Sequence, residues 1–302
     1  MIKEMTNSVV VEGILSEIGL ERATFTKDAV THDCIRGDVK VKVVTPIVSG
    51  GEAQELEIPV RCFVKRLTNS GNENPAYTSL ANIIDNGKSI AAVGIDTADA
   101  VRITGASIRM QEYFSPDGRF ITYPSISASF INVIKRSDLD FKAKAEIEMV
   151  VQQMKRLTDK DGIETGTLQI LGATVGYGEY TDVIPFVTSN PKYVAAIEAS
   201  YGEGDVMKVV ACLNFNTTTE KTYEEVAIGD PIERVRTINV SDLVIASVAP
   251  SEIAADDIDP ADLTACLNKR TARIEATKQK TANKQNAERN KATEKAKANL
   301  GF

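Results

Sequence analysis

The stretch "VRITGASIRMQEYFSPDGRFITYPSISASFINVI", residues 101–134, has the rhythm of a β-hairpin followed by a last apolar strand. Apolar and polar side chains alternate along it, as they do in half-buried strands. Near its tip the hairpin carries three rings, Tyr113, Phe114 and Phe120, and two arginines, Arg109 and Arg119. A further ring lies at Tyr123. A hairpin that only closes a sheet needs none of these, so its tip is predicted to bind something.

The residues before this hairpin predict three strands and then a helix. Patterns rich in β-branched residues indicate strands over 8–20, 38–48 and 56–67. The segment 74–88 changes to a helical period and has Gly87 as a cap. Strands are expected to resume with "SIAAVGI" (89–95) and 100–114, and 125–135 ends the unit. The predicted order is three strands, one helix and two strands.

A second unit with the same plan begins near Ala143. Its first segment, 145–157, is either a long strand or a short helix, because its period is ambiguous. Two strands around a Gly-rich bend follow over 166–189, then a helix over 190–202 that Asn-Pro opens. The segments 204–216 and 233–248 are the last two strands. Its rings are expected mostly in the core: Tyr177, Tyr180, Phe186 and Phe215.

The last region, 251–302, differs in composition from both units. It has five acids and no base up to Asn268, and ten Lys/Arg against three acids from Lys269 onward. Asp259 or Asp262 is expected to cap a helix that Pro260 starts. The basic half has few large apolar residues, so it is predicted to be a solvated helix or a disordered tail. The chain as a whole carries a net charge of −7, so any anion-binding surface must be a local patch.

Three strands, a helix and two strands is the order of the OB-fold, a small Greek-key barrel that often binds oligonucleotides. The stretch 101–134 resembles the C-terminal half of single-stranded-DNA-binding (SSB) proteins, and "VVVEGILSEIG" resembles their first strand. The resemblance covers about 8–136, and a tandem of two such units is similar to SSB proteins of phages and mobile elements. It implies a mainly β chain with OB-fold 1 over 1–138, OB-fold 2 over 139–250, and a linker and tail over 251–302. Unlike the better-known SSB proteins, the chain has no Trp, is acidic overall and ends in a basic tail with a terminal Phe302.

Two strands are predicted to present a binding face for single-stranded DNA. Side chains alternate between the two faces of a strand, which places Val60, Cys62 and Val64 of the segment 56–67 toward a core. The opposite face then carries a cation, a ring and a cation: Arg61, Phe63 and Lys65. The same rule puts Arg109, Gln111 and Tyr113 on one face of 100–114. Rings that stack on bases and cations that contact phosphates are what such a binder needs. The predicted site residues are Arg61, Phe63, Lys65, Arg66, Arg109, Tyr113, Phe114, Arg119 and Tyr123.

Other kinds of site find little support in the sequence. His32 is the only histidine, which argues against a Ser-His-Asp site or a multi-histidine metal site. The four cysteines form no CxxC pair and are expected to be reduced thiols in a cytoplasm. No apolar run is long enough to cross a membrane, and no signal peptide is predicted. We therefore expect no catalytic residue, no metal, no cofactor and no membrane partner.

The leading hypothesis is a non-enzymatic, cytoplasmic protein that coats and protects single-stranded DNA in phage or mobile-element replication or recombination. Two alternatives stay open. One is a virion structural or tail protein whose β-domains assemble with one another, which the acidic composition favours. The other is a replisome or conjugation accessory whose OB-folds bind protein. Contacts of the tail with replication or recombination proteins, and a homo-oligomer, are compatible with the sequence.

Overall fold

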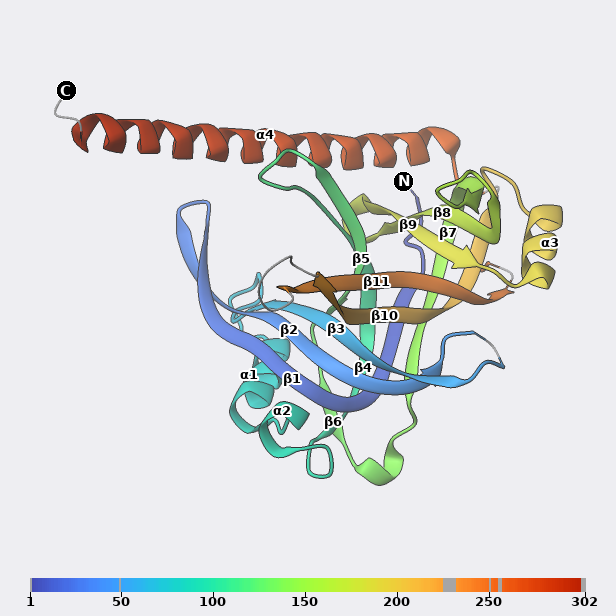
Figure 1. Ribbon diagram of the computed structural model, residues 1–302, viewed down its shortest axis with the longest axis horizontal. Coiled ribbons are helices and arrows are strands. Elements are labelled where there is room, and N and C mark those ends of the chain that lie inside the picture. The colour runs from blue at the N-terminus through green and yellow to red at the C-terminus, as the bar shows by residue number, and fades with distance from the viewer. Residues whose placement is uncertain (1, 49, 225–231, 250, 255–256, 300–302) are drawn as a thin grey trace.

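A computed structural model describes residues 2–48, 50–224, 232–249, 251–254 and 257–299. The chain is mainly β, with two compact lobes of strands beneath one long C-terminal helix (Figure 1). The first lobe and its connections contain β1 (Asn7–Lys27), β2 (Val30–Pro46), β3 (Ala53–Lys65), α1 (Pro75–Asn86), α2 (Ile90–Val93), β4 (Ala100–Phe114), β5 (Phe120–Ala128), β6 (Asn132–Ile134) and the short helix η1 (Arg136–Asp138). The rest contains β7 (Lys142–Thr158), β8 (Glu164–Gly176), η2 (Tyr177–Glu179), β9 (Tyr180–Thr188), α3 (Pro191–Ser200), β10 (Val206–Glu224), β11 (Ile232–Ala249) and α4 (Pro260–Asn299).

The pairing of β1 to β5 closes a five-stranded barrel. β1 pairs antiparallel with β2 and β4, β2 pairs antiparallel with β3, β3 runs parallel to β5, and β5 pairs antiparallel with β4. The barrel therefore closes in the order β1-β2-β3-β5-β4, and α1 connects β3 to β4. This Greek-key connection is that of the OB-fold.

The second lobe repeats the same topology. β7, β8, β9, β11 and β10 close in that order, with β9 and β11 parallel and α3 between β9 and β10. The predicted fold class, two OB-fold barrels with a C-terminal extension, is confirmed. The ambiguous segment 145–157 is a strand, since it belongs to β7 and pairs with both β8 and β10.

The two barrels share one sheet because their first strands pair with each other. Residues 7–12 of β1 run antiparallel to residues 142–147 of β7, and the resulting sheet has eleven strands within the described residues. The main apolar core accordingly includes Val9 and Leu15 of the first barrel and Ile147 and Phe186 of the second.

Two glycines allow the strands of the first barrel to bend. A Cβ on Gly13 would lie 2.2 Å from the carbonyl oxygen of Lys42, so only glycine fits where β1 coils against β2. Gly105 has a φ of +68°, which side-chain-bearing residues rarely adopt, and it lies where the β1–β4 register shifts. The strand with a central glycine on which the SSB resemblance rests is β4, and it contains a bulge at Gly105.

Each barrel contains one helix that Asn-Pro opens. The side chains of Asn74 and Asn190 accept hydrogen bonds from the amides of Ala76 (3.1 Å) and Lys192 (3.0 Å), and a proline follows each asparagine at the first helical position. Both predicted helices are confirmed.

The prediction of a strand over 89–95 is wrong. Residues 90–93 form the short helix α2, in which the amides of Ala92 and Val93 both donate to the carbonyl of Ser89 (3.0 Å each). Two adjacent alanines favour a helical turn, and Gly94, with a φ of +79°, ends it. The next strand starts at Ala100 instead.

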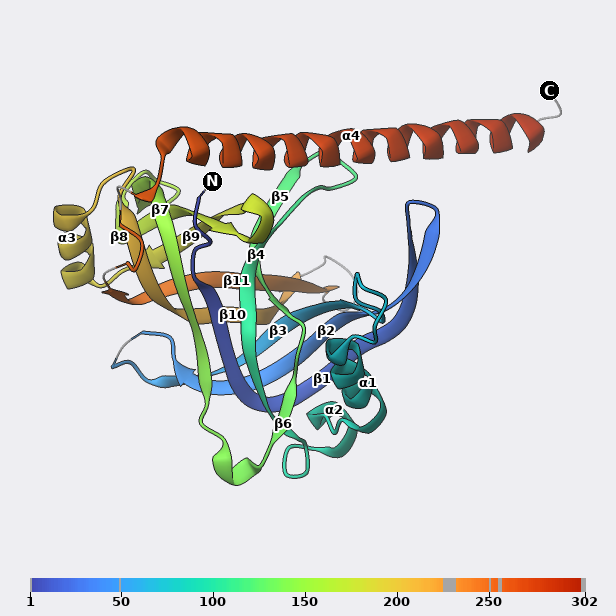
Figure 2. The same ribbon diagram turned by 180° about the vertical axis from the view of Figure 1, so that it is seen from behind.

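The basic region forms helix α4, and Asp259 is its cap: its carboxylate accepts from the amide of Ala261 at 2.8 Å. The start of α4 packs through Cys266 and the preceding Ile253 and Ile258 on Ile2 and Val150. The helix then lies along the tip of the β4–β5 hairpin and extends past it (Figures 1 and 2). Within the described ranges, no helix is long and apolar enough to span a membrane.

Candidate nucleic-acid interface

The alternation predicted for β3 is observed. Val60, Cys62 and Val64 are buried, while Arg61, Phe63 and Lys65 face outward, and the Phe63 side chain is 51% exposed. In β4, Ile108 and Met110 are likewise buried. The sequence rule therefore assigned the core and outer faces of both strands correctly.

Phe63 lies in a small group of rings that we call the outer-face cluster, made of Phe25, His32, Phe63 and Lys65. The Phe25 ring stacks on His32 with centroids 5.2 Å apart and meets Phe63 edge-on at 5.4 Å. The Lys65 ammonium lies 5.9 Å from the centre of the Phe25 ring. Phe25 and His32 were missed in the sequence because β1 and β2 run beyond their predicted ends. They meet across the β1–β2 hairpin.

A second group, the hairpin cluster, lies near the tip of β4 and β5 and contains Tyr113, Phe114, Phe120 and Tyr123. Tyr113 and Tyr123 pack edge-on with centroids 6.4 Å apart, and Phe114 and Phe120 pack at 5.2 Å. Tyr113 and Phe120 are 41% and 44% exposed. The Lys278 ammonium of α4 lies 5.9 Å from the centre of the Phe114 ring, so the end of this hairpin is next to the helix.

Most of the predicted cations have carboxylate partners. Arg61 lies 3.4 Å from Asp38, Arg66 lies 3.4 Å from Asp33, and Arg119 lies 2.5 Å from its neighbour Asp117. Arg61 also donates to Gln111 Oε1 at 2.6 Å, which joins β3 to β4 across β5. These pairs hold the guanidinium groups in place but reduce the charge that they offer to a phosphate.

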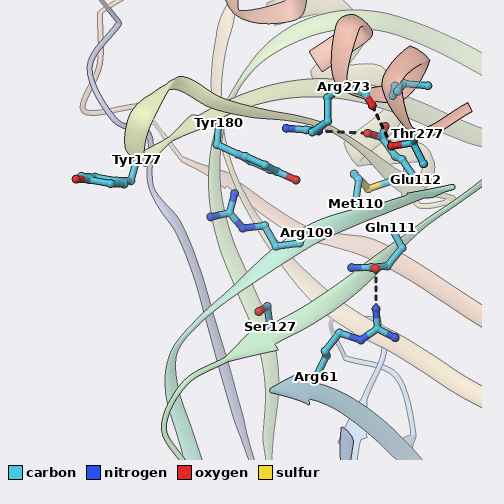
Figure 3. Close-up of a pocket in the computed structure, with 11 residues that line it drawn as sticks. Arg61, Arg109, Met110, Gln111, Glu112, Ser127, Tyr177, Tyr180, Arg273 and Thr277 are labelled. Atoms are coloured by element: carbon cyan, nitrogen blue, oxygen red, sulfur yellow. Dashed lines mark hydrogen bonds and ion pairs between the residues drawn. The ribbon is translucent and has the colours of Figure 1, made fainter. Parts of the chain in front are cut away.

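Arg109 points away from the outer-face cluster, into a cavity of about 510 Å³ between the first barrel, the η2 turn and α4 (Figure 3). There the Tyr180 ring lies between two guanidinium groups, 4.6 Å from that of Arg109 and 3.9 Å from that of Arg273. Tyr177 lies at the edge of this cavity and is 86% exposed.

The expectation that the second-barrel rings lie in the core holds for only two of the four. Phe186 and Phe215 are buried, but Tyr177 and Tyr180 line the cavity instead. The η2 turn takes the chain out of the barrel, with left-handed backbone at Gly178 (φ +67°) and Glu179 (φ +61°). Arg273 was also missed, since nothing in a basic helical tail distinguishes the cation that docks from those that do not.

Two buried carboxylates hold α4 against this cavity. Glu112 is ion-paired with Arg270 and lies 3.5 Å from Arg273, while Asp182 lies 3.5 Å from Arg109 and 3.6 Å from Arg273. Burial raises the pKa of Asp182, and the two neighbouring guanidinium groups oppose that rise. The helix therefore contributes cations that neutralise acids of both barrels.

The described residues contain no group of three or more His, Cys, Asp or Glu side chains able to hold a metal ion. All four cysteines are buried and free. Burial raises the pKa of the Cys62 thiol to about 12, so this thiol is poorly reactive.

Comparisons with known proteins identify one family. Two solved structures are similar in their overall arrangement, both of the single-stranded DNA binding protein from Thermus aquaticus. The wild-type protein matches with a TM-score of 0.48 at 10% identity, over 84% of this chain and 99% of its own. A deletion mutant of that protein, which also carries an arginine-to-alanine substitution, matches with a TM-score of 0.46 at 10% identity, over 85% and 98%. No curated protein matches the sequence. The model of the YorF family matches residues 6–280, which include both barrels and half of α4, and the chain therefore belongs to the YorF family.

Proposed function

We propose that this protein binds single-stranded DNA with little sequence preference and protects it. The observation that supports this most strongly is the pair of exposed ring clusters on the first barrel. In OB-folds, oligonucleotides bind over strands 2 and 3, between the loop that joins strands 1 and 2 and the loop that joins strands 4 and 5. The outer-face cluster lies on β1, β2 and β3, and the hairpin cluster lies on β4 and β5.

The chemistry of these clusters suits unstacked bases. A ring stacks on any base, because every base has a π-face, and each such contact contributes roughly 1–3 kcal/mol. Arg61, Lys65 and Arg66 lie on or just after β3 and are in place to contact phosphates. Weak sequence preference follows, since stacking and phosphate contacts do not read base edges.

The cellular context of the proposal rests on the sequence resemblance. We place the protein in the cytoplasm, in the replication or recombination of phage or mobile-element DNA, as a non-enzymatic binder. A tail contact with replication or recombination proteins is part of the proposal. Phe302, the last residue of the tail, lies outside the described residues.

The test is fluorescence anisotropy of labelled oligo-dT and of a matched duplex, in low and moderate salt. Binding to the single strand only, weakening with salt, is the expected result, because phosphate contacts release counterions. No binding to oligo-dT at low salt would contradict the proposal. Equal binding to both forms would point to phosphate contacts alone.

Assembly through the β-domains is the second candidate, and the charge distribution favours it. The chain has a net charge of −7, and Arg61, Arg66 and Arg119 already face carboxylates. Sedimentation velocity distinguishes the two proposals, since assembly predicts large particles that form without DNA.

A further inference from the structure

Three cavities between the two barrels share lining residues. The cavity of Figure 3, about 510 Å³, shares Arg61 with a second one of about 140 Å³. The second shares Tyr123 and Phe215 with a third, of about 580 Å³. We call this set the inter-barrel groove. One wall comes from β3, β4 and β5, the other comes from β9, β10 and β11, and α4 lies at one end.

Rings and cations alternate along the groove. Tyr177 and Tyr180 lie at the end next to α4, and Tyr123 lines the third cavity, where the buried Phe215 forms part of the wall. Between Tyr177 and Tyr123 lies Arg61, which donates a hydrogen bond of 2.6 Å to Gln111. A flexible chain of bases and phosphates presents the same alternation of flat rings and anions.

The charge of the groove is complementary to a phosphate chain. Among the described side chains that line it, the guanidinium groups of Arg61, Arg109 and Arg273 accompany the carboxylates of Asp38 and Glu112. Three positive groups against two negative ones leave an excess of positive charge among the lining side chains, on a chain whose net charge is −7. The groove is thus a local cationic patch of the kind that the acidic composition requires.

The groove also has room for nucleotides. Its two larger cavities, of about 510 and 580 Å³, fall within the range of roughly 300–1,000 Å³ that is usual for small-ligand pockets. Each has room for a base with its sugar, and the cavity of about 140 Å³ shares lining residues with both.

We propose that single-stranded DNA runs through the inter-barrel groove, so that both barrels and α4 bind one and the same strand. Tyr177 stacks on a base at the α4 end, Arg61 contacts a phosphate midway, and Tyr123 stacks on a base in the third cavity. This inference rests on the proposed function and adds a path for the strand between the barrels, beyond the outer face of the first barrel.

Thiol footprinting tests the path, because all four native cysteines are buried. Ser127→Cys places a nearly isosteric thiol in the groove next to Arg61. Tyr177→Cys places one at its entrance, where the side chain is 86% exposed. Ser137→Cys is the matched control, because Ser137 is exposed in η1, which directly follows β6, and β6 lies at the far end of the molecule from α4 (Figure 1). Each full-length variant reacts with dithionitrobenzoate, with and without saturating oligo-dT.

Oligo-dT is expected to slow the reaction of the Ser127→Cys and Tyr177→Cys thiols at least tenfold and to change that of Ser137→Cys less than twofold. Unchanged rates at both groove positions, with anisotropy showing saturated binding, would overturn the groove while leaving the proposed function intact. No anisotropy change with oligo-dT would overturn the proposed function and the groove together.

The affinity of Tyr177→Ala gives a second measure of the same path. Loss of one stacked base lowers affinity about 5- to 150-fold, from roughly 1–3 kcal/mol per base. Ile163→Ala, another highly exposed apolar position in the turn between β7 and β8, is the control and should leave affinity unchanged. Equal affinities for both variants would overturn the role of Tyr177.

Discussion

At the scale of single residues, the outward positions of β3 and β4 present rings to solvent. Phe63 and Tyr113 are 51% and 41% exposed, although neither is needed to fill the core. Each has another ring beside it, at 5.4 Å for Phe25 and 6.4 Å for Tyr123. The exposed face of such a pair is suited to stacking against a base.

The double variant Phe63→Ala with Tyr113→Ala should weaken oligo-dT binding by roughly 2–6 kcal/mol in total, if each ring stacks on one base. Anisotropy titrations measure the loss, and circular dichroism checks that the variant is folded. Ile163→Ala serves as the control. An unchanged affinity in the folded double variant would remove both rings from the site.

Two buried glutamates lie at matching places in the first strand of each barrel. Glu12 of β1 accepts two hydrogen bonds from Arg102 (2.7 and 3.0 Å) and one from the amide of Asp140 (2.8 Å). Glu148 of β7 accepts from the amide of Thr6 (3.0 Å), and from the amide of Glu252 (2.9 Å) and the hydroxyl of Ser251 (3.0 Å). Each carboxylate thus ties down a segment that enters or leaves a barrel.

The charge of Glu148 should make the protein acid-sensitive. Burial alone would raise its pKa, but the donated hydrogen bonds outweigh burial and lower the pKa from 4.5 to about 2. A lowered pKa in the folded state stabilises the protein above pH 4.5, and this stability is lost as the pH falls toward 2. The shift corresponds to roughly 3 kcal/mol.

Glu148→Gln should therefore lower the free energy of unfolding by about 3 kcal/mol at pH 7. Between pH 5 and pH 2, the free energy of unfolding of this variant should depend less on pH than that of the native chain. Urea unfolding across this range measures both effects. Glu146→Gln, an exposed position on β7 that pairs with Lys208, should cost less than about 1 kcal/mol. The same acid sensitivity in Glu148→Gln as in the native chain would contradict the assignment.

At the scale of elements, α4 docks mainly through charge along its middle. Arg270 pairs with Glu112, Arg273 donates to the carbonyl of Thr181 at 3.0 Å, and Gln285 donates to that of Pro116 at 2.7 Å. The acids beneath it are buried, with Glu112 5% and Asp182 0% exposed. Removing a cation therefore leaves an uncompensated buried charge.

Arg270→Leu should destabilise the protein by roughly 3 kcal/mol, because breaking a buried pair costs more than the pair contributes. Adding Glu112→Leu should restore part of that loss, since both charges are then gone. Lys278→Ala, a cation of α4 whose contact is with the Phe114 ring, is the control and should change stability by less than about 1 kcal/mol. Urea unfolding measures all three variants, and equal costs for Arg270→Leu and Lys278→Ala would contradict the role of Glu112.

At the scale of the whole molecule, the pairing of β1 with β7 makes the two barrels one structure. The apolar core crosses this junction, and α4 contacts both barrels. We propose boundaries at 1–138, 139–250 and 251–302 for the two OB-folds and the tail, with the first two units folding together.

Calorimetry should accordingly give one unfolding transition, with calorimetric and van't Hoff enthalpies in a ratio of about 1. Two barrels with separate cores would unfold in two transitions. Val10→Pro in β1 is the informative variant, because a proline removes an amide from a paired strand and should lower the midpoint of the single transition. Two resolved transitions in the native chain would contradict shared folding.

Local sequence patterns were enough to predict most of the strands, the helices that Asn-Pro opens and the faces of β3 and β4. Period two sets which side chains share a face, and Asn-Pro satisfies the amides of a first helical turn. Val60 and Phe63 were therefore assigned to opposite faces correctly. Where the local signal was weak, as at Ala91 and Ala92, a helix formed in place of the predicted strand.

Which residues meet between the barrels could be learned from the folded chain alone. Tyr180, Arg109 and Arg273 come from β9, β4 and α4, and no spacing along the chain relates them. Their meeting depends on the β1–β7 pairing and on the docking of α4. Both are long-range contacts, formed by hydrogen bonds between strand edges and by ion pairs with buried acids. The stacking of Phe25 on His32 depends likewise on the register of the β1–β2 hairpin, which brings the two rings opposite each other.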